Sequence, residues 1–395
     1  MTAVATADSA PTSAARGIAI PPFYAGHIGA RAAERARRGL EVIAMHFGQP
    51  SERASPAALA AARTHLGERI AGPSGYWESA PLRERIALHY REQYDVDVSP
   101  ERILLTTGAS AGLVATFTAL FAAGDRVALA RPGYPAYRNA LRALGRVPVE
   151  IDCGPAHGFR LAPELLPPTN EALHGLLVAS PANPTGSVLG AAALAALAAE
   201  CRRRGTRFIS DEIYHGIAYA GQCTSALQVE PDALVINSFS KLFRMPGWRI
   251  GWLVAPEWGV AQLHSHLINF FLTPPAIAQH AALAAFDDLA LLRRSVDTYA
   301  ANRARLLEAL PTMGLAGMAP PEGAFYLYVD VSHLTSDSLA FCKELLDDTG
   351  IAIAPGIDFD PVHGSGFVRL SFAISEREVE RAIALLGPWL DSRTR

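Results

Sequence analysis

The chain has 395 residues, of which 50% are apolar and 18% charged, so it is long enough to bury a substantial core and to divide into two domains. Its formal net charge is -3, and no cluster of Lys and Arg is interleaved with aromatic residues. Composition therefore gives no electrostatic basis for binding nucleic acid, and without an apolar run of about 18 residues a membrane partner is not expected either.

The N-terminal residues and the cysteines indicate a cellular compartment. Residues 1–16 are rich in Ala, Ser and Thr and are predicted to be disordered. They lack the basic start and the continuous apolar stretch of an export signal. The cysteines lack the paired spacing of a zinc site or a redox motif and stand far apart, at Cys153, Cys201, Cys223 and Cys342. Because the histidines show no metal-binding spacing either, we expect a cytoplasmic protein without a metal site.

From residue 101 to residue 256, short apolar runs alternate with helical patterns. This alternation predicts an α/β fold with a mainly parallel sheet covered by helices. The runs lie at 103–107, 127–131, 176–180, 208–211, 234–238 and 250–254. Functional groups in such sheets gather beyond the carboxyl ends of the strands. The segments that follow the runs are polar, ionisable or rich in Gly and Pro, at 108–110, 132–134, 183–186, 211–214 and 238–241.

After this region the pattern changes. Apolar residues at helical spacing over 283–310 predict a long helix that connects two domains. Beyond Pro311, segments 323–329 and 367–372 are predicted strands with helices between and after them, which indicates a smaller α+β domain. Residues up to about Gly48 are predicted to pack with it. The expected division is a small domain of residues 17–48 and 290–395 and a large domain of residues 49–289.

The first strand end, Thr107-Gly108-Ala109-Ser110, stands between a strand and an apolar helix. Free backbone N–H groups at the start of that helix would bind an anion, although a glycine before a helix is also common in an ordinary turn. Tyr134 follows the next strand on a rigid Pro-Gly-Tyr-Pro turn, where its ring either stacks on a flat heterocycle or packs in the core.

A carboxylate ends the run Arg-Phe-Ile-Ser-Asp. A strand core excludes Asp211 unless a cation or several donors compensate its charge, and capping a helix is the local alternative. Tyr214 lies three residues further on, and Asn183 ends another strand in Ser-Pro-Ala-Asn-Pro-Thr-Gly. The three side chains are expected at the same edge of the sheet.

Lys241 closes the run Val-Ile-Asn-Ser-Phe-Ser-Lys and brings an amine to that edge together with the hydroxyls of Ser238 and Ser240. Desolvation there would lower its pKa and free the amine for attack on a carbonyl, whereas a lysine considered alone is more often solvated. Arg249 follows among apolar residues that would bury its guanidinium unless an anion lies against it. A phosphate fits that planar fork, and a structural ion pair is the alternative.

Arg369 is a cation within the apolar strand Gly-Phe-Val-Arg-Leu-Ser-Phe. Its guanidinium requires a carboxylate, supplied either by the protein or by a substrate.

Taken together, these residues resemble the class I/II aminotransferases, enzymes of pyridoxal-phosphate (PLP) fold type I. The resemblance runs from about Gly48 to the last strand and rests on Asn183-Pro184-Thr185-Gly186, Asp211-Glu212-x-Tyr214, Ser238-x-Ser240-Lys241 and Arg249. It implies a seven-stranded, mainly parallel sheet sandwiched by helices, with a smaller α+β domain formed from both termini.

The resemblance also implies a role for each candidate residue. Lys241 is the Schiff-base lysine, and the cofactor phosphate is held by Gly108, Ala109, Ser110, Ser238, Ser240 and Arg249. Asp211 pairs with the pyridine nitrogen, Tyr214 and Asn183 meet the phenolic oxygen, and Tyr134 stacks on the ring. Arg369 binds the substrate α-carboxylate with help from Asn183 and the backbone of Gly48. In the family a tyrosine of the partner subunit reaches the phosphate, which implies a homodimer with shared active sites and makes Tyr76 the candidate. The stretch from Tyr76 to Leu82 is shorter than in the family.

The expected reaction is transamination between an L-amino acid and a 2-oxo acid by a ping-pong route. A PLP-dependent lyase or cyclase is the alternative, because the motifs above do not distinguish these outcomes. We expect a neutral donor, apolar or aromatic, since Ala109 and Ser110 follow the glycine of the phosphate turn and the stretch from His266 to Pro275 contains no Arg or Lys.

Overall fold

The computed structural model describes residues 18–66, 78–318 and 321–394. Its central element is a sheet of seven strands in the order β2-β8-β7-β6-β5-β3-β4. All neighbours pair in parallel except β8, which runs antiparallel to both β2 and β7. The strands are β2 (Ile103–Thr106), β3 (Arg126–Arg131), β4 (Val147–Asp152), β5 (Gly175–Ala179), β6 (Arg207–Asp211), β7 (Leu234–Ser238) and β8 (Gly251–Val254).

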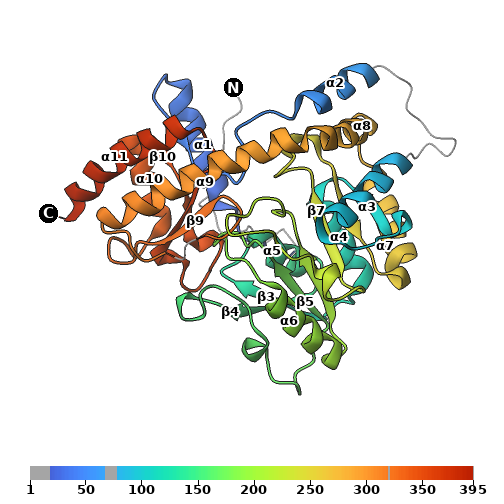
Figure 1. Cartoon of the computed structure of the whole chain (residues 1–395). Helices are drawn as coiled ribbons and strands as arrows, with labels where there is room; N and C mark the ends of the chain where they lie inside the picture. The colour runs from blue at the N-terminus through green and yellow to red at the C-terminus, as the bar shows by residue number, and fades with distance from the viewer. Residues whose placement is uncertain (1–17, 67–77, 319–320, 395) are drawn as a thin grey trace.

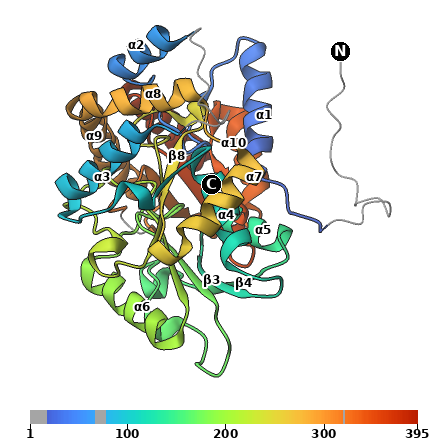
Figure 2. The same cartoon turned by 90° about the vertical axis from the view of Figure 1, so that its right-hand side faces the viewer.

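Helices cover both faces of this sheet (Figures 1 and 2). Leu104, Ile209 and Leu253 belong to the apolar cluster that also contains α4 (Gly108–Leu120), α5 (Pro135–Ala143) and α7 (Val260–Phe271). The strand residues that alternate with them, such as Leu105 and Phe208, belong to the cluster with α3 (Ala80–Tyr94), α6 (Ala191–Arg204) and α8 (Ala276–Ala285). Because successive side chains of a strand point to opposite faces, strands buried on both sides are apolar throughout. The predicted α/β fold with a sandwiched, mainly parallel sheet is confirmed.

The C-terminal region forms two smaller sheets. Strand β1 (Ile43–Ala44) pairs in parallel with β10 (Ile351–Ala352), and β12 (Phe367–Ser371) lies between β11 (Ala354–Pro355) and β9 (Tyr326–Asp330). Three helices complete the region, namely α1 (Tyr24–Arg37), α10 (Ser338–Thr349) and α11 (Glu376–Thr394). Figure 1 shows α1 beside α10 although more than 300 residues separate them in the chain. Residues before Gly48 therefore pack with the C-terminal region.

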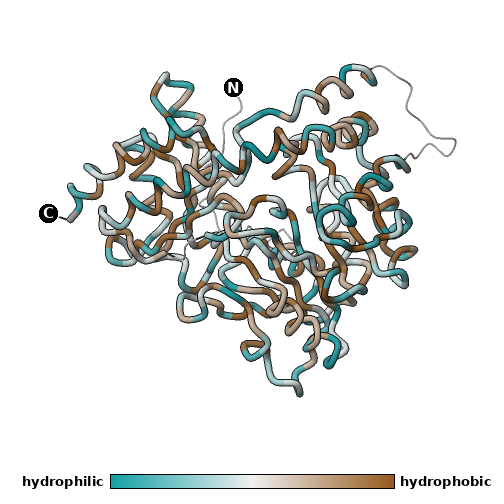
Figure 3. The backbone as a smooth tube through the Cα atoms, in the orientation of Figure 1, coloured by the Kyte–Doolittle hydropathy of each residue, from teal (hydrophilic) through white to brown (hydrophobic). Residues whose placement is uncertain are grey.

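The predicted long helix over 283–310 is two helices in the structure. A short 3-10 helix at Phe286–Asp288 separates α8 from α9 (Leu289–Thr312). The Asp288 carboxylate accepts a hydrogen bond from Ala57 N at 2.8 Å beside α2 (Pro56–His65). Buried residues recur along α9 at intervals of three or four, as a helix with one buried face requires. Figure 3 shows the matching alternation of hydrophilic and hydrophobic segments along the outer helices.

Four of the described strands were not predicted from the sequence, namely the two-residue strands β1, β10 and β11 and, in the large sheet, β4. Strand β4 lies at the edge of the sheet, contains Pro148 and Glu150, and is only partly buried over most of its length. It therefore has no continuous apolar run. Among the described residues, no helix is long and apolar enough to cross a membrane.

Candidate active site

A pocket at the carboxyl edge of the sheet collects most of the residues that the sequence indicated. Residues from six strand ends and from both terminal regions line it, namely Gly48, Ala109, Ser110, Tyr134, Asn183, Asp211, Tyr214, Ser238, Ser240, Lys241, Arg249 and Arg369. Gly108 lies directly beneath Arg249, since a Cβ atom there would stand 2.4 Å from Arg249 Nη2. Tyr76 lies outside the described residues.

Lys241 extends into this pocket from the end of β7. Its Nζ donates a hydrogen bond to the carbonyl of Gly48 at 2.6 Å and lies 5.6 Å from the centre of the Tyr214 ring. Burial lowers the pKa of Lys241 to about 8, and the nearby Arg369 guanidinium acts in the same direction. A substantial fraction of the amine is consequently neutral at slightly alkaline pH, as nucleophilic or general-base chemistry requires.

One end of the pocket presents donors suited to an anion. The Arg249 guanidinium donates to Pro246 O at 2.9 Å, and Ser238 Oγ and Ser240 Oγ are 3.1 Å apart. The first turn of α4 has no side-chain cap from Thr107, so its N–H groups are free for a ligand. Gly108 has a φ of +75°, a left-handed conformation that favours glycine, and a side chain there would collide with Arg249.

Arg249 reaches this end because β8 is antiparallel. The residue before an antiparallel strand lies at the same edge as the residues after its parallel neighbours. Contrary to the expectation that apolar neighbours would bury it, Arg249 is exposed. Its φ of +55° is costly for a residue with a Cβ atom, and strain of this kind often marks a functional position.

Asp211 also lines the pocket and is 3% exposed. Its Oδ2 accepts a hydrogen bond from the Tyr137 hydroxyl at 2.7 Å, and its Oδ1 accepts one from Ile213 N at 3.0 Å. The second contact is a local turn, so the alternative of a helix cap is not realised. Burial raises the pKa of Asp211 to about 6, partly offset by these two hydrogen bonds and by Lys241. The carboxylate thus lies in a site where a cation would stabilise it.

Arg369 is 2% exposed and forms no ion pair among the described residues. Its Nη1 donates to Asn183 Oδ1 at 2.9 Å and its Nη2 to His46 O at 2.6 Å, whereas its buried Nε has no hydrogen-bond partner. Burying a guanidinium without a carboxylate is costly, and several of its five donors remain unused. The protein-carboxylate alternative is therefore not found, and a ligand carboxylate fits the unused donors.

Two further tyrosines, Tyr137 and Tyr326, line the pocket. Tyr137 is one helical turn beyond Tyr134, and this i, i+3 spacing on α5 was the available signal. Tyr326 forms a 2.6 Å hydrogen bond with the Tyr214 hydroxyl, and a Cβ atom at Gly48 would overlap its hydroxyl. Tyr326 comes from β9 in the C-terminal region, so no spacing in the sequence linked it to Tyr214. Phe23 and Phe47 also line the pocket.

These features fit PLP. A phosphate matches the donors near Arg249, and a protonated pyridine nitrogen matches the uncompensated Asp211 carboxylate. Lys241 and Tyr134 line the same pocket. No cluster of metal-binding side chains occurs within residues 18–66, 78–318 and 321–394. Fold and pocket together define a PLP-dependent enzyme of fold type I.

Comparison with known proteins gives the family. The family model described as aminotransferase class I and II matches residues 41–386. A valine–pyruvate aminotransferase of Mycobacterium tuberculosis is 45% identical over 378 residues, which cover 95% of this chain and 97% of that protein. An aspartate/prephenate aminotransferase of Thermus thermophilus is 33% identical over 377 residues, covering 92% and 95%. A solved aminotransferase structure from Mycobacterium tuberculosis matches with a TM-score of 0.91 at 44% identity, covering 94% and 97%.

The chain belongs to the class I and II aminotransferase family. It is a PLP-dependent transaminase, as the resemblance implied. Each relative named above is an aminotransferase, so these comparisons do not support the lyase or cyclase alternative.

Proposed function

We propose that this transaminase takes a neutral L-amino acid, apolar or aromatic, as donor and a 2-oxo acid as acceptor by a ping-pong route. The supporting observation is the charge of the pocket. Its cationic side chains among the described residues are Lys241, Arg249 and Arg369. Each already has a proposed ligand group: the cofactor carbonyl for Lys241, the phosphate for Arg249 and the substrate α-carboxylate for Arg369. Arg244 is held by Glu52, with Nε and Oε2 2.9 Å apart, and does not line the pocket. Among the described lining residues, a second substrate carboxylate would thus find no further cation. The relative named for valine and pyruvate, both neutral in their side chains, agrees with this proposal.

For the chemical step we propose that Lys241 carries the cofactor covalently between turnovers and acts as general base and acid during them. When bound, PLP withdraws electrons from the amino-acid Cα and so acidifies its proton. Lys241 Nζ would remove the proton from Cα as a base and, as an acid, would donate it to a carbon of the bound cofactor. Its pKa of about 8 suits both directions near neutral pH.

The other proposed roles concern the phosphate and the ring of the cofactor. Gly108, Ala109, Ser110, Ser238, Ser240 and Arg249 bind the phosphate, with Tyr76 supplied by a second copy of the chain. Asp211 keeps the pyridine nitrogen protonated, and Tyr137 orients the Asp211 carboxylate through the 2.7 Å hydrogen bond. Tyr134 stacks on the ring. Tyr214 and Asn183 are the donors proposed for the phenolic oxygen.

Three broader expectations remain proposals. A homodimer with shared active sites is supported by the exposed apolar residues Phe270 and Leu272, 59% and 52% exposed, near the end of α7. The proposed division into 17–48 with 290–395 and 49–289 is supported by the pairing of β1 with β10. A cytoplasmic location is supported by four buried free cysteines, because disulfides are rare in that compartment.

Replacing Arg369 with alanine is expected to weaken binding of an amino acid on the order of a hundredfold. Charge-assisted hydrogen bonds contribute about 1.5–3 kcal/mol each, and the substrate α-carboxylate would lose at least one. The corresponding amine has no carboxylate and should be affected much less. Half-reaction rates with valine and with isobutylamine measure the difference, and thermal unfolding checks that the variant folds. Equal losses for the two substrates would refute the carboxylate clamp.

For the wild-type enzyme, we expect valine, leucine or phenylalanine to react about ten- to a hundredfold more efficiently than aspartate or glutamate. Leaving a second carboxylate unpaired in a partly dry pocket costs about 1–3 kcal/mol, which corresponds to that selectivity. Stopped-flow half-reactions with the five amino acids give kcat/KM for each. A preference for the two acidic donors would exclude the proposed substrate class.

A further inference from the structure

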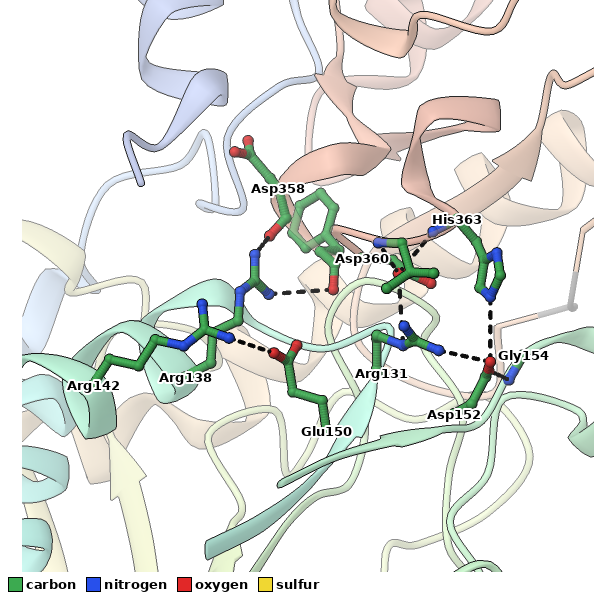
Figure 4. Close-up of polar contacts among 11 residues, drawn as sticks. Arg131, Arg138, Arg142, Glu150, Asp152, Gly154, Asp358, Asp360 and His363 are labelled. Atoms are coloured by element: carbon green, nitrogen blue, oxygen red, sulfur yellow. Dashed lines mark hydrogen bonds and ion pairs between the residues drawn. The ribbon is translucent and has the colours of Figure 1, made fainter. Parts of the chain in front are cut away.

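A loop of the C-terminal region, Asp358 to Asp360, is held by a buried arginine of α5. Arg138 is 4% exposed, and its guanidinium donates to Asp358 O at 2.5 Å and to Phe359 O at 3.4 Å. Figure 4 shows Arg138 reaching from α5 to Asp358, whereas Arg142 on the same helix turns to Glu150. The two accepting carbonyls lie on either side of the Phe359 Cα atom, so Arg138 fixes the backbone that carries the Phe359 ring.

A second set of contacts attaches the same loop to the turn before Tyr134. Gly133 N donates to Phe359 O at 3.1 Å. Arg131, at the end of β3, lies 2.7 Å from Asp152 Oδ2 and 3.7 Å from Asp360 Oδ1 (Figure 4). The loop is therefore anchored to the sheet-bearing part of the molecule next to the pocket.

Phe359 in turn contacts Arg369, the residue proposed to bind the substrate carboxylate. The Phe359 side chain is fully buried, and the Arg369 guanidinium carbon lies 4.6 Å from its ring centre and 4.4 Å from that of Tyr326. Within the described part of the chain, two hydrogen bonds orient the guanidinium and Nε has no partner. Contact with an aromatic face attracts a cation most strongly when both are desolvated, as they are here. The Phe359 ring thus contributes to the orientation of the clamp.

We infer that Phe359, held in place by Arg138, is a positioning residue that sets Arg369 for the substrate α-carboxylate. This inference rests on the carboxylate clamp proposed above. It connects α5, which begins after Tyr134 and carries Tyr137, to the arginine proposed to bind the amino-acid carboxylate. Asp358 extends the connection, because its carboxylate accepts from Tyr24 N and Ala25 N, both at 2.8 Å, beside the pocket residue Phe23.

The test uses the PLP-loaded enzyme with Phe359→Leu, Arg138→Met and the matched control Arg142→Met. Arg142 lies one turn from Arg138 on α5, and its contact is Glu150, at 3.0 Å. Dissociation of isovalerate, a carboxylate without an amino group, is measured by calorimetry together with KM and kcat for valine and isobutylamine. We expect Phe359→Leu to raise the isovalerate Kd and the valine KM about threefold to thirtyfold. The kcat, the amine kinetics and cofactor affinity should change less than about twofold. Arg138→Met should act in the same direction, and Arg142→Met should match wild type.

Arg369→Ala separates this inference from the clamp on which it rests. If Arg369→Ala weakens isovalerate and Phe359→Leu does not, the positioning role is overturned and the clamp stands. If neither variant weakens isovalerate, the clamp itself fails. Equal losses for valine and isobutylamine in Phe359→Leu would indicate general structural damage and would also overturn the inference. Arg138→Lys, which keeps the charge without the fork, replaces Arg138→Met if that variant does not fold.

Discussion

Replacing Lys241 with alanine is expected to remove the covalent bond between enzyme and cofactor and to lower kcat by at least about 10²- to 10⁴-fold. A positioned general acid or base typically contributes a rate factor of about 10² to 10⁴, and loss of the covalent link lowers kcat further. The chain contains two lysines, Lys241 and Lys343. Lys343 lies on the exposed side of α10, outside the pocket. No second lysine among the described residues can take over the position.

The scarcity of lysine makes the measurement direct. Borohydride reduction followed by peptide mass spectrometry should find the reduced cofactor on the Lys241 peptide of the wild type and on no peptide of Lys241→Ala. Lys343→Ala is the matched control and should retain both the label and the activity. A wild-type protein that carries no reduced cofactor on the Lys241 peptide would overturn the proposed role.

Replacing Asp211 with alanine is expected to lower half-reaction rates on the order of a hundred- to a thousandfold, with the fold preserved. Breaking a buried ion pair costs about 3–5 kcal/mol, and the pyridine nitrogen would lose the carboxylate that keeps it protonated. Stopped-flow half-reactions with valine measure the loss. Glu212→Gln is the control, because Glu212 is equally buried but accepts from Ser225 Oγ and Ala226 N instead of lining the pocket. Near-normal rates in Asp211→Ala would mean that the residue serves only its local turn.

The same carboxylate has a consequence for stability that does not depend on turnover. The pKa of Asp211 is raised from 3.8 to about 6, so the folded apoprotein binds more protons than the unfolded chain between about pH 4 and pH 6. Stability from this group is thus present at low pH and lost as pH rises through that window, by on the order of 3 kcal/mol. Apo Asp211→Asn lacks this loss. Relative to the wild-type apoprotein, its free energy of unfolding should rise between pH 4 and pH 7, and urea unfolding at both pH values measures it. Parallel pH dependence in the two proteins would contradict the raised pKa.

The sequence alone determined the elements and the chemistry at their ends. Strands buried on both faces are continuous apolar runs, so β2, β3, β5, β6, β7 and β8 were predictable within one or two residues at each end. Because parallel strands share a carboxyl edge, the meeting of Asp211, Asn183 and Lys241 followed from local patterns. The edge strand β4, half-exposed and containing Pro148, has no such run and was missed.

Only the tertiary structure decided the contacts between residues distant in the chain. The antiparallel direction of β8 brings Arg249 to the proposed phosphate site. A four-residue apolar run does not indicate whether its strand will pair parallel or antiparallel to its neighbours. Three contacts depend on how β9, β12 and α5 pack around the sheet. They are the hydrogen bonds of Tyr137 with Asp211 and of Tyr326 with Tyr214, and the contact of the Phe359 ring with Arg369. Local spacing encodes which side of one element a residue occupies, whereas the partner across a pocket is selected by the packing of the whole chain.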